Sequence, residues 1–298
     1  MAPAGADTVT AVGALRQGGR GARAGRTFCT GRGSSPSSSV MFPVSDDNPT
    51  LRRPVVTYAL LATLLLVFVV VQGAGGVTDP YRLLASVCNY GMVPAELLHT
   101  RPVGYAVPMG PGMACVVDAE PINVLTPLTS MFLHGGWGHL LSNSLFLWVF
   151  GNNVEDSMGR GRFIAFYLIC GLAAAAAHVL VEPNSPVPTV GASGAISGVL
   201  GGYLLLYPKV RVRTFFPPFF LFHVPAWVIL VFWFVQQVVA GLPQLSRMRP
   251  DVSAGVAVWA HIGGFVAGAL LVKLFASPGR VARRNTAGDA QAAFQPTG

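Results

Sequence analysis

Six long apolar segments constrain this chain more than any other feature of its sequence. They run over Val55–Gln72, Gly138–Val154, Phe163–Val181, Gly191–Tyr207, Val224–Gly241 and Gly255–Phe275. Each approximates the ~20 residues that a helix needs to cross a bilayer. Only 11% of the residues are charged, whereas a soluble domain has about a quarter. We therefore predict an all-α membrane protein built as a bundle of six transmembrane helices.

The positions of the basic residues predict how these segments are oriented. Seven of the 20 Lys and Arg residues precede the first segment. The later loops on the same predicted side contain Arg160, Arg162, Lys209, Arg211, Arg213, Arg280, Arg283 and Arg284. The opposite loops are poorer in positive charge for their length, with Arg82, Arg101, Arg247 and Arg249. Loops rich in Lys and Arg stay in the cytoplasm, so we predict two cytoplasmic termini and, despite the net charge of +8, no nucleic-acid partner.

The segments divide the chain into a core and two tails. Residues 1–50 are rich in Gly, Ala, Ser and Arg and lack apolar periodicity, which predicts a disordered basic cytoplasmic tail. The six-span core covers residues 51–276, and residues 277–298 form a short disordered cytoplasmic tail. No apolar stretch typical of a secretory signal follows Met1, and translation from Met1 and from Met41 are both left open.

Residues 73–125 form a long loop on the predicted extracytoplasmic side. Long unstructured loops are uncommon, so we expect a folded or interfacial element. Cys88 and Cys115 lie in this loop, and both a disulfide between them and two unpaired thiols are left open. The four cysteines, which include Cys29 and Cys170, lack metal-ligand spacing. We therefore predict no metal site.

Four polar residues fall at one depth in three of the segments. His139 and Asn143 lie near the start of the second segment, Ser193 near the start of the fourth, and His261 in the first third of the sixth. With a rise of 1.5 Å per residue, each lies about 10 Å or less below the outer surface. Polar residues are costly inside a membrane and usually face a cavity where they act.

These residue types fit nucleophilic catalysis. Ser193 is placed at the N-terminal end of a helix, where free backbone N–H groups and the helix dipole stabilise an oxyanion. His261 can take the serine proton as a general base. The last three segments contain no Asp or Glu, which predicts a Ser–His dyad and not a triad. His139 and Asn143 share a helix face and would donate to the oxyanion, and we group Gly191 with this substrate-stabilising set.

Small residues predict close packing of the fourth and sixth segments. They recur as Gly194, Gly198 and Gly202 in the fourth segment and as Ala260, Gly264 and Gly268 in the sixth. Faces of this kind let two membrane helices approach closely, which would bring Ser193 and His261 within reach of each other. Taken singly, the serine and each histidine also fit a role in helix packing. Their coincidence at one depth favours catalysis.

Three stretches resemble the signature segments of the rhomboid intramembrane serine proteases. They are HGGWGHLLSN (His134–Asn143), GASGAISG (Gly191–Gly198) and AHIGGFVAG (Ala260–Gly268). Two more stretches, GNNVED (Gly151–Asp156) and NYGMVP (Asn89–Pro94), are also similar to that family. The resemblance covers about residues 50–276 and implies the basic, prokaryotic-type form with six transmembrane helices.

The resemblance implies Ser193 as nucleophile, His261 as base, and His139 and Asn143 with the Ser193 backbone as the oxyanion site. It implies cleavage of single-span membrane proteins near the outer face of a bacterial plasma membrane, without cofactor or metal. The loop Pro243–Ser253 would cap the site. The substrate helix would enter past the fifth segment and its bulky residues Trp227, Phe232, Trp233 and Phe234. Ser197 departs from the pattern, because some members place an aromatic residue there against the catalytic histidine.

Two other classes of function compete with this interpretation. A catalytically silent relative would bind membrane clients, but such relatives typically lack the serine or the histidine, and this chain has Ser193 and His261. A small transporter would show an internal repeat and helices broken at mid-membrane, but no such repeat is found, and the polar layer lies near the outer face. The natural substrate and the oligomeric state are not predicted.

Overall fold

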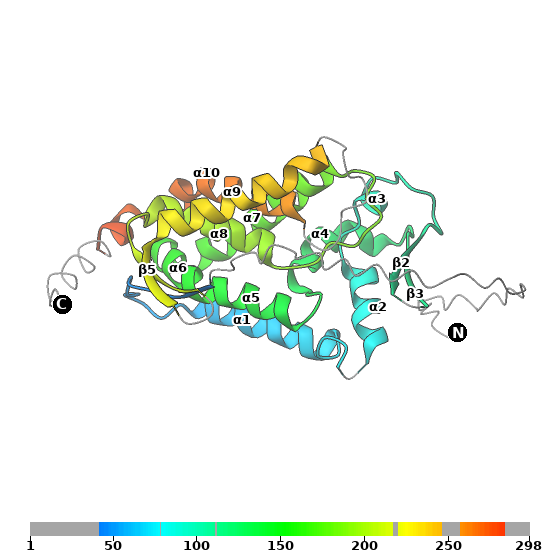
Figure 1. Cartoon of the computed structure of the whole chain (residues 1–298), viewed down its shortest axis with the longest axis horizontal. Helices are drawn as coiled ribbons and strands as arrows, with labels where there is room; N and C mark the ends of the chain where they lie inside the picture. The colour runs from blue at the N-terminus through cyan, green and yellow to red at the C-terminus, as the bar shows by residue number, and fades with distance from the viewer. Residues whose placement is uncertain (1–41, 78, 111, 217–219, 246–256, 284–298) are drawn as a thin grey trace, which may run out of the picture.

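The computed structural model describes residues 42–77, 79–110, 112–216, 220–245 and 257–283 of the chain. Within them, all six predicted apolar segments form helices (Figure 1). The helices are α1 (Val55–Leu66) with the π-helical turn η1 (Val67–Val71), the continuous run α5 (Trp137–Phe146), η4 (Leu147–Gly151) and α6 (Asn152–Met158), and then α7 (Arg160–Val181), α8 (Ser193–Leu206), α9 (Ala226–Leu245) and α10 (Val258–Phe275).

Three of these helices are long and apolar enough to cross a membrane. They are α7, the part of α9 from Ala226 to Pro243, and α10. The segment Val55–Val71 and helix α8 are shorter apolar helices. Helix α7 begins three residues earlier than the apolar run predicts. Gly159 separates it from α6, and its φ of 87°, which glycine adopts readily, lets the chain change direction between the two helices.

Helix α8 lies among the other helices and packs closely against α7 and α10. A β-carbon at Gly264 would collide with the Gly194 carbonyl group, and one at Gly268 would collide with the Gly198 carbonyl group. On the α7 side, a β-carbon at Gly194 would lie 2.7 Å from that of Ala174. The small-residue faces therefore allow the close approach of helices that the sequence predicts.

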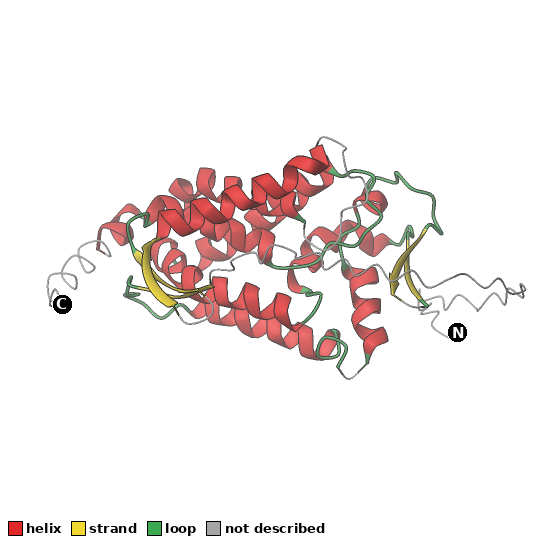
Figure 2. Ribbon diagram, in the orientation of Figure 1, coloured by secondary structure: helices red, strands yellow, loops and turns green. Residues whose placement is uncertain are grey.

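A three-stranded antiparallel sheet lies at one end of the helices (Figure 2). Its strands are β1 (Phe42–Asp46), β4 (Arg211–Phe216) and β5 (Phe220–Pro225), in the order β1-β4-β5. Phe42 pairs with Phe215, and Arg211 pairs with Pro225. We call this end of the molecule, with the sheet and the helix termini beside it, the sheet end.

The structure corrects the predicted boundaries of both tails. Phe42–Asp46 was assigned to the disordered tail 1–50, but it forms β1 because β4 supplies its backbone partners. In the tail 277–298, residues 278–283 form a helical turn, and the Ser277 N–H donates to the Ser157 carbonyl oxygen. Residues 1–41 and 284–298 lie outside the described part of the chain.

Two buried acidic side chains at the sheet end accept hydrogen bonds from the start of α1 and from the residues just before it. The Glu155 carboxylate accepts hydrogen bonds from the backbone N–H groups of Val56 and Thr57, at 3.0 and 2.8 Å, and from the Thr57 hydroxyl, at 2.8 Å. Asp156 accepts from the Leu51 N–H at 2.7 Å. The first N–H groups of a helix have no intrahelical partner, so the GNNVED stretch supplies a cap from a distant part of the chain.

The predicted outer loop 73–125 is folded, as its length predicts, and lies at the opposite end of the helices (Figure 1). It contains α2 (Pro80–Tyr90), α3 (Pro94–Leu97), the hairpin of β2 (Ala106–Gly110) and β3 (Met113–Val116), and the turn η2 (Pro121–Leu125). The turns α4 (Thr126–Thr129) and η3 (Ser130–Phe132) lead from it to α5. A disulfide joins Cys88 of α2 to Cys115 of β3, which settles the choice that the sequence leaves open.

Candidate active site

The first residue of α8 contacts a histidine of α10. The Ser193 Oγ lies 2.7 Å from the His261 Nε2, which is hydrogen-bonding distance for a serine and a general base. Ser193 begins its helix after Gly191, whose φ of 133° allows the sharp turn of the chain into α8. The two predicted catalytic residues, 68 positions apart in sequence, are therefore in direct contact.

The second ring nitrogen of His261 also has a partner. The His261 Nδ1 lies 2.9 Å from the Oε1 atom of Gln237 in α9. An amide oxygen only accepts hydrogen bonds, so this contact requires the proton on Nδ1 and leaves the Nε2 lone pair facing the Ser193 hydroxyl. The ring of Trp233, one turn earlier on α9, lies beside the same imidazole, with 5.7 Å between the ring centroids.

A cavity of about 770 Å³ surrounds this pair. Its walls come from α5, α7, α8, α9 and α10 and from the segment that precedes α8. Its lining includes His139, Asn143, Gly191, Ser193, Trp233 and His261. The serine, the two histidines and the asparagine that the sequence places at one depth therefore line one space.

Two side chains of the cavity lining carry hydrogen-bond donors. The Asn143 side chain is only 6% exposed, and its Nδ2 atom has no hydrogen-bond partner among the described residues. The His139 Nδ1 accepts from the Gly135 N–H at 3.3 Å, so the neutral ring carries its hydrogen on Nε2. The Ser193 N–H adds a third donor, because the first residue of a helix has no carbonyl partner in that helix.

Gly191 contributes space and not a donor. Its N–H already donates to the Ser130 carbonyl oxygen at 2.9 Å, so among the predicted substrate-stabilising residues Gly191 does not offer a free backbone donor. A β-carbon at Gly191 would lie 2.8 Å from both the Cε1 and the Nε2 of His139. Glycine at this position therefore leaves room for the imidazole beside Ser193.

Other predicted residues have structural partners near the site. The Ser197 hydroxyl donates to the Ser193 carbonyl oxygen at 2.6 Å, a contact within the helix. His178 of α7 also lines the cavity, and its Nε2 lies 3.1 Å from the Thr189 Oγ1. Gly202 is close to Phe166 of α7, because a β-carbon added at Gly202 would lie 3.2 Å from that ring. The predicted cap, Pro243–Ser253, lies mostly outside the described residues.

Gln237 is the site residue that the sequence analysis missed. It stands in an apolar helix, where a polar side chain is unusual and so is a signal of function.

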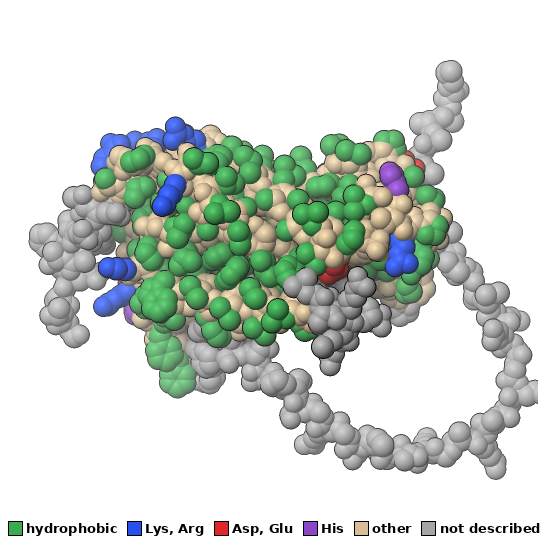
Figure 3. All heavy atoms as spheres, turned by 90° about the horizontal axis from the view of Figure 1, so that it is seen from above, with side chains coloured by type: hydrophobic (Ala, Val, Ile, Leu, Met, Phe, Trp, Pro, Cys, Tyr) green, Lys and Arg blue, Asp and Glu red, His purple; other side chains and the backbone are tan. Residues whose placement is uncertain are grey.

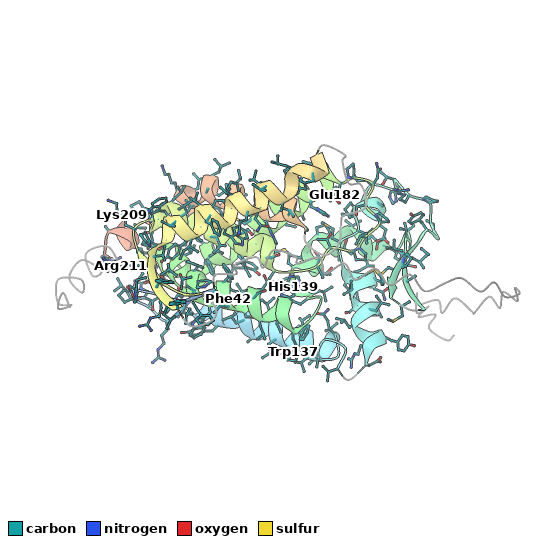
Figure 4. The ribbon with its side chains drawn as sticks, in the orientation of Figure 1. Phe42, Trp137, His139, Glu182, Lys209 and Arg211 are labelled. Carbon is teal, nitrogen blue, oxygen red and sulfur yellow. A yellow bond between two sulfur atoms is a disulfide. The ribbon has the colours of Figure 1, made fainter. Side chains whose placement is uncertain are left out.

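The bulky residues predicted on the substrate side of α9 do not all face outward. Trp227 and Phe232 are exposed, whereas Phe234 stacks on Phe265 with 4.6 Å between ring centroids. Figure 4 shows His139 on α5, away from Lys209 and Arg211 at the sheet end.

Within the described residues, no group of three or more His, Cys, Asp or Glu side chains lies together as metal ligands do. Among the polar groups of the cavity, the Ser193 hydroxyl and the His261 imidazole bond to each other, and the Asn143 amide and the His139 imidazole line the same space. A hydroxyl bonded to an imidazole, beside unpaired donors, can carry out acyl transfer.

Comparison with known proteins identifies the family. A rhomboid domain matches residues 122–278, which is more than half of the chain. The chain belongs to the rhomboid family. This membership confirms the resemblance of the three signature stretches, and it makes the mostly helical fold that of a membrane helical bundle.

Several curated rhomboid proteins align with this chain over part of their length. The Rhomboid protease GluP of Bacillus subtilis is 33% identical over 164 residues, which are 55% of this chain and 26% of that protein. Rhomboid-like protein 11, chloroplastic, of Arabidopsis thaliana is 42% identical over 72 residues, which are 24% of this chain and 25% of that protein. Rhomboid protein 1, mitochondrial, of Saccharomyces cerevisiae is 32% identical over 105 residues, 33% of this chain and 29% of that protein. The chain thus aligns with about a quarter of the length of these relatives.

Proposed function

We propose that this rhomboid protein is an intramembrane serine endopeptidase that cuts transmembrane helices with a dyad of Ser193 and His261. One observation carries the proposal: the Ser193 Oγ lies 2.7 Å from the His261 Nε2 in a cavity that also holds the unpartnered Asn143 amide. A nucleophile, its base and a donor for the developing charge are the parts that acyl transfer requires.

The reaction follows from the positions of these atoms. The Ser193 oxygen attacks the carbonyl carbon of a peptide bond while its proton moves to the His261 Nε2. The carbonyl oxygen becomes an oxyanion, which the Asn143 Nδ2, the His139 Nε2–H and the Ser193 N–H stabilise. The C–N bond then breaks, and His261 gives its proton to the departing amine. Water, losing a proton to the His261 Nε2, attacks the acyl carbon; the bond to the Ser193 oxygen then breaks, and His261 returns the proton to that oxygen, which releases the second product and restores the free serine.

The proposal includes the arrangement in the membrane. We take the six helical segments α1, α5 with η4 and α6, α7, α8, α9 and α10 as six spans, with both termini in the cytoplasm. Lys and Arg side chains gather at the sheet end, as Figure 3 shows, and Lys209, Arg211 and Arg280 belong to it. By the positive-inside rule this end faces the cytoplasm. The cavity then opens toward the extracytoplasmic side of a plasma membrane, and the substrates are single-span membrane proteins.

Cleavage of a synthetic single-span substrate by purified protein tests this function. Wild type is compared with Ser193→Ala, His261→Ala and Ser197→Ala. Ser197 is the matched control, because it stands one turn further along α8 and its hydroxyl donates to a backbone carbonyl of the same helix, that of Ser193. Removing either member of the dyad should lower kcat by roughly 10⁴-fold or more, while Ser197→Ala should cut at nearly the wild-type rate.

The same experiment separates the alternatives. Cleavage near the extracytoplasmic end of the substrate helix is the expected result, found by mass spectrometry of the products. If wild type binds several such helices in detergent but cuts none, the protein is a client-binding member of the family. Equal cleavage by Ser193→Ala would show that another nucleophile acts.

A further inference from the structure

The catalytic histidine is held on its far side by α9. His261 belongs to α10 and reaches Ser193 of α8 through its Nε2. From α8 it receives no aromatic support, because the residue one turn after Ser193 is Ser197, whose hydroxyl donates to the Ser193 carbonyl oxygen. The contacts of the imidazole with Trp233 and Gln237 both come from α9.

Gln237 is suited to bind the imidazole and little else. It is half-buried in an apolar helix, between Gln236, which is exposed, and Val238. A buried amide costs free energy unless it is hydrogen-bonded, and the Oε1 of Gln237 finds its partner 2.9 Å away at the His261 Nδ1. Trp233 stands four residues earlier, so both side chains share one face of α9.

This contact selects one chemical form of the imidazole. A neutral histidine carries its hydrogen on either Nδ1 or Nε2, and only the Nδ1–H form can accept the Ser193 proton at Nε2. The Gln237 oxygen accepts from Nδ1–H and so stabilises that form. A triad uses a carboxylate for the same purpose. Here a neutral amide takes that position.

We propose that Gln237 is a positioning residue, which holds His261 in the tautomer and orientation that accept the Ser193 proton. The inference rests on the proposed function of the dyad. It makes α9, the predicted side of substrate entry, part of the machinery that orients the base, with Trp233 fixing the ring plane and Gln237 fixing its rotation.

Three variants of α9 test this role in the full-length protein. Gln237→Leu removes the acceptor, and Gln237→Glu keeps an oxygen at the same reach whether or not the carboxyl group is protonated. Gln236→Leu is the matched control, because it makes the same change at the neighbouring exposed position. For each variant, kcat and KM are measured on the synthetic substrate, and the rate of Ser193 labelling is measured with a small fluorophosphonate that needs no substrate helix.

Gln237→Leu should lower kcat and the labelling rate together by about 10- to 100-fold with KM unchanged, since orientation of the base is lost and binding is not. Gln237→Glu should restore most of the rate, and Gln236→Leu should match wild type. A Gln237→Leu protein with wild-type kcat, or with a changed KM alone, would overturn the inference while leaving the dyad intact. A wild type that neither cuts nor labels would overturn the proposed function and this inference with it.

Discussion

The two ends of the helical bundle both bury polar groups, but they differ in whether those groups have partners. At the sheet end, Glu155 accepts three hydrogen bonds, and the Tyr203 hydroxyl donates to Asp46 at 2.5 Å. At the end that holds the cavity, which we call the site end, the Asn143 Nδ2 is buried without a partner among the described residues. Polar groups of similar kinds thus serve different purposes.

The difference teaches where to look for function in an apolar protein. A buried polar group that is fully hydrogen-bonded holds the structure together, whereas one that is left unpaired costs about 1–3 kcal/mol. The sheet end contains the first kind, because Glu155 accepts hydrogen bonds from the Val56 and Thr57 N–H groups at the start of α1. The site end retains the second kind, and the proposed oxyanion would be the missing partner.

Among the changes that test this comparison of buried polar groups, the largest effect is expected from the unpaired Asn143 amide. Asn143→Leu keeps the size of the side chain and removes the donor, so kcat should fall by about 10²- to 10³-fold with little change in KM or stability. Steady-state cleavage of the synthetic substrate measures it. The matched control is Ser142→Ala, whose hydroxyl donates to the His139 carbonyl oxygen at 3.0 Å and is therefore already paired. An Asn143→Leu protein that unfolds more easily but cuts normally would break the comparison.

At the sheet end the expected effect is on folding and not on chemistry. Glu155→Leu leaves the N–H groups of Val56 and Thr57 without their acceptor, and we expect a loss of about 3 kcal/mol in the free energy of unfolding. Equilibrium unfolding in detergent micelles measures this loss. The exposed Glu120→Leu serves as the control. The activity of the molecules that remain folded should be unchanged, and a selective loss of kcat would contradict the division between the two ends.

The smallest expected effect concerns a third buried carboxyl group, Glu96, in the folded loop. Burial, with the charge of Asp118 beside it, raises the pKa of Glu96 from 4.5 to about 7. The folded loop then binds a proton that the unfolded chain releases, so stability falls as pH rises from 4.5 to 7. Glu96→Gln should remove this dependence and stabilise the loop at neutral pH.

Protection of the loop amides from hydrogen exchange, followed between pH 5 and 8 and corrected for the intrinsic exchange rate, measures the Glu96 effect. Glu120→Gln, an exposed change in the same loop, should leave the pH profile as it is. The result sharpens the comparison, because Glu96 accepts one backbone hydrogen bond, from Asp118 at 3.3 Å. It is therefore intermediate between Glu155, which accepts three hydrogen bonds, and the Asn143 Nδ2, which has no partner among the described residues. A flat wild-type profile would show that the raised pKa of Glu96 is wrong.

The helices and the dyad could be predicted because both depend on one-dimensional patterns. A helix across a bilayer needs a long apolar run, and depth along it follows from counting residues. Ser193 and His261 therefore could be placed at one level before their contact was known. The disulfide of Cys88 and Cys115 could not be decided in this way, because it depends on a Cα separation of 5.3 Å that the loop fold creates.

The strands and Gln237 escaped prediction for a related reason. Phe42–Asp46 has only five residues, and its partners in β4 are far along the chain, so no local pattern marks it as a strand. The partner of Gln237 depends on how α9 is rotated about its axis. A span with two adjacent glutamines shows that a polar contact exists, but the rotation decides that Gln237 and not Gln236 meets His261.

The pairing of β1 with β4 also sets an order of events during synthesis. Asp46 leaves the ribosome long before Val212, its partner in the sheet, and at about 5–20 residues per second the delay is on the order of ten seconds. Helices α1, α5, α7 and α8 are all made in that interval. Strand β1 therefore cannot pair until β4 has been made, so the β1–β4 pairing forms only when the first four apolar segments are already present.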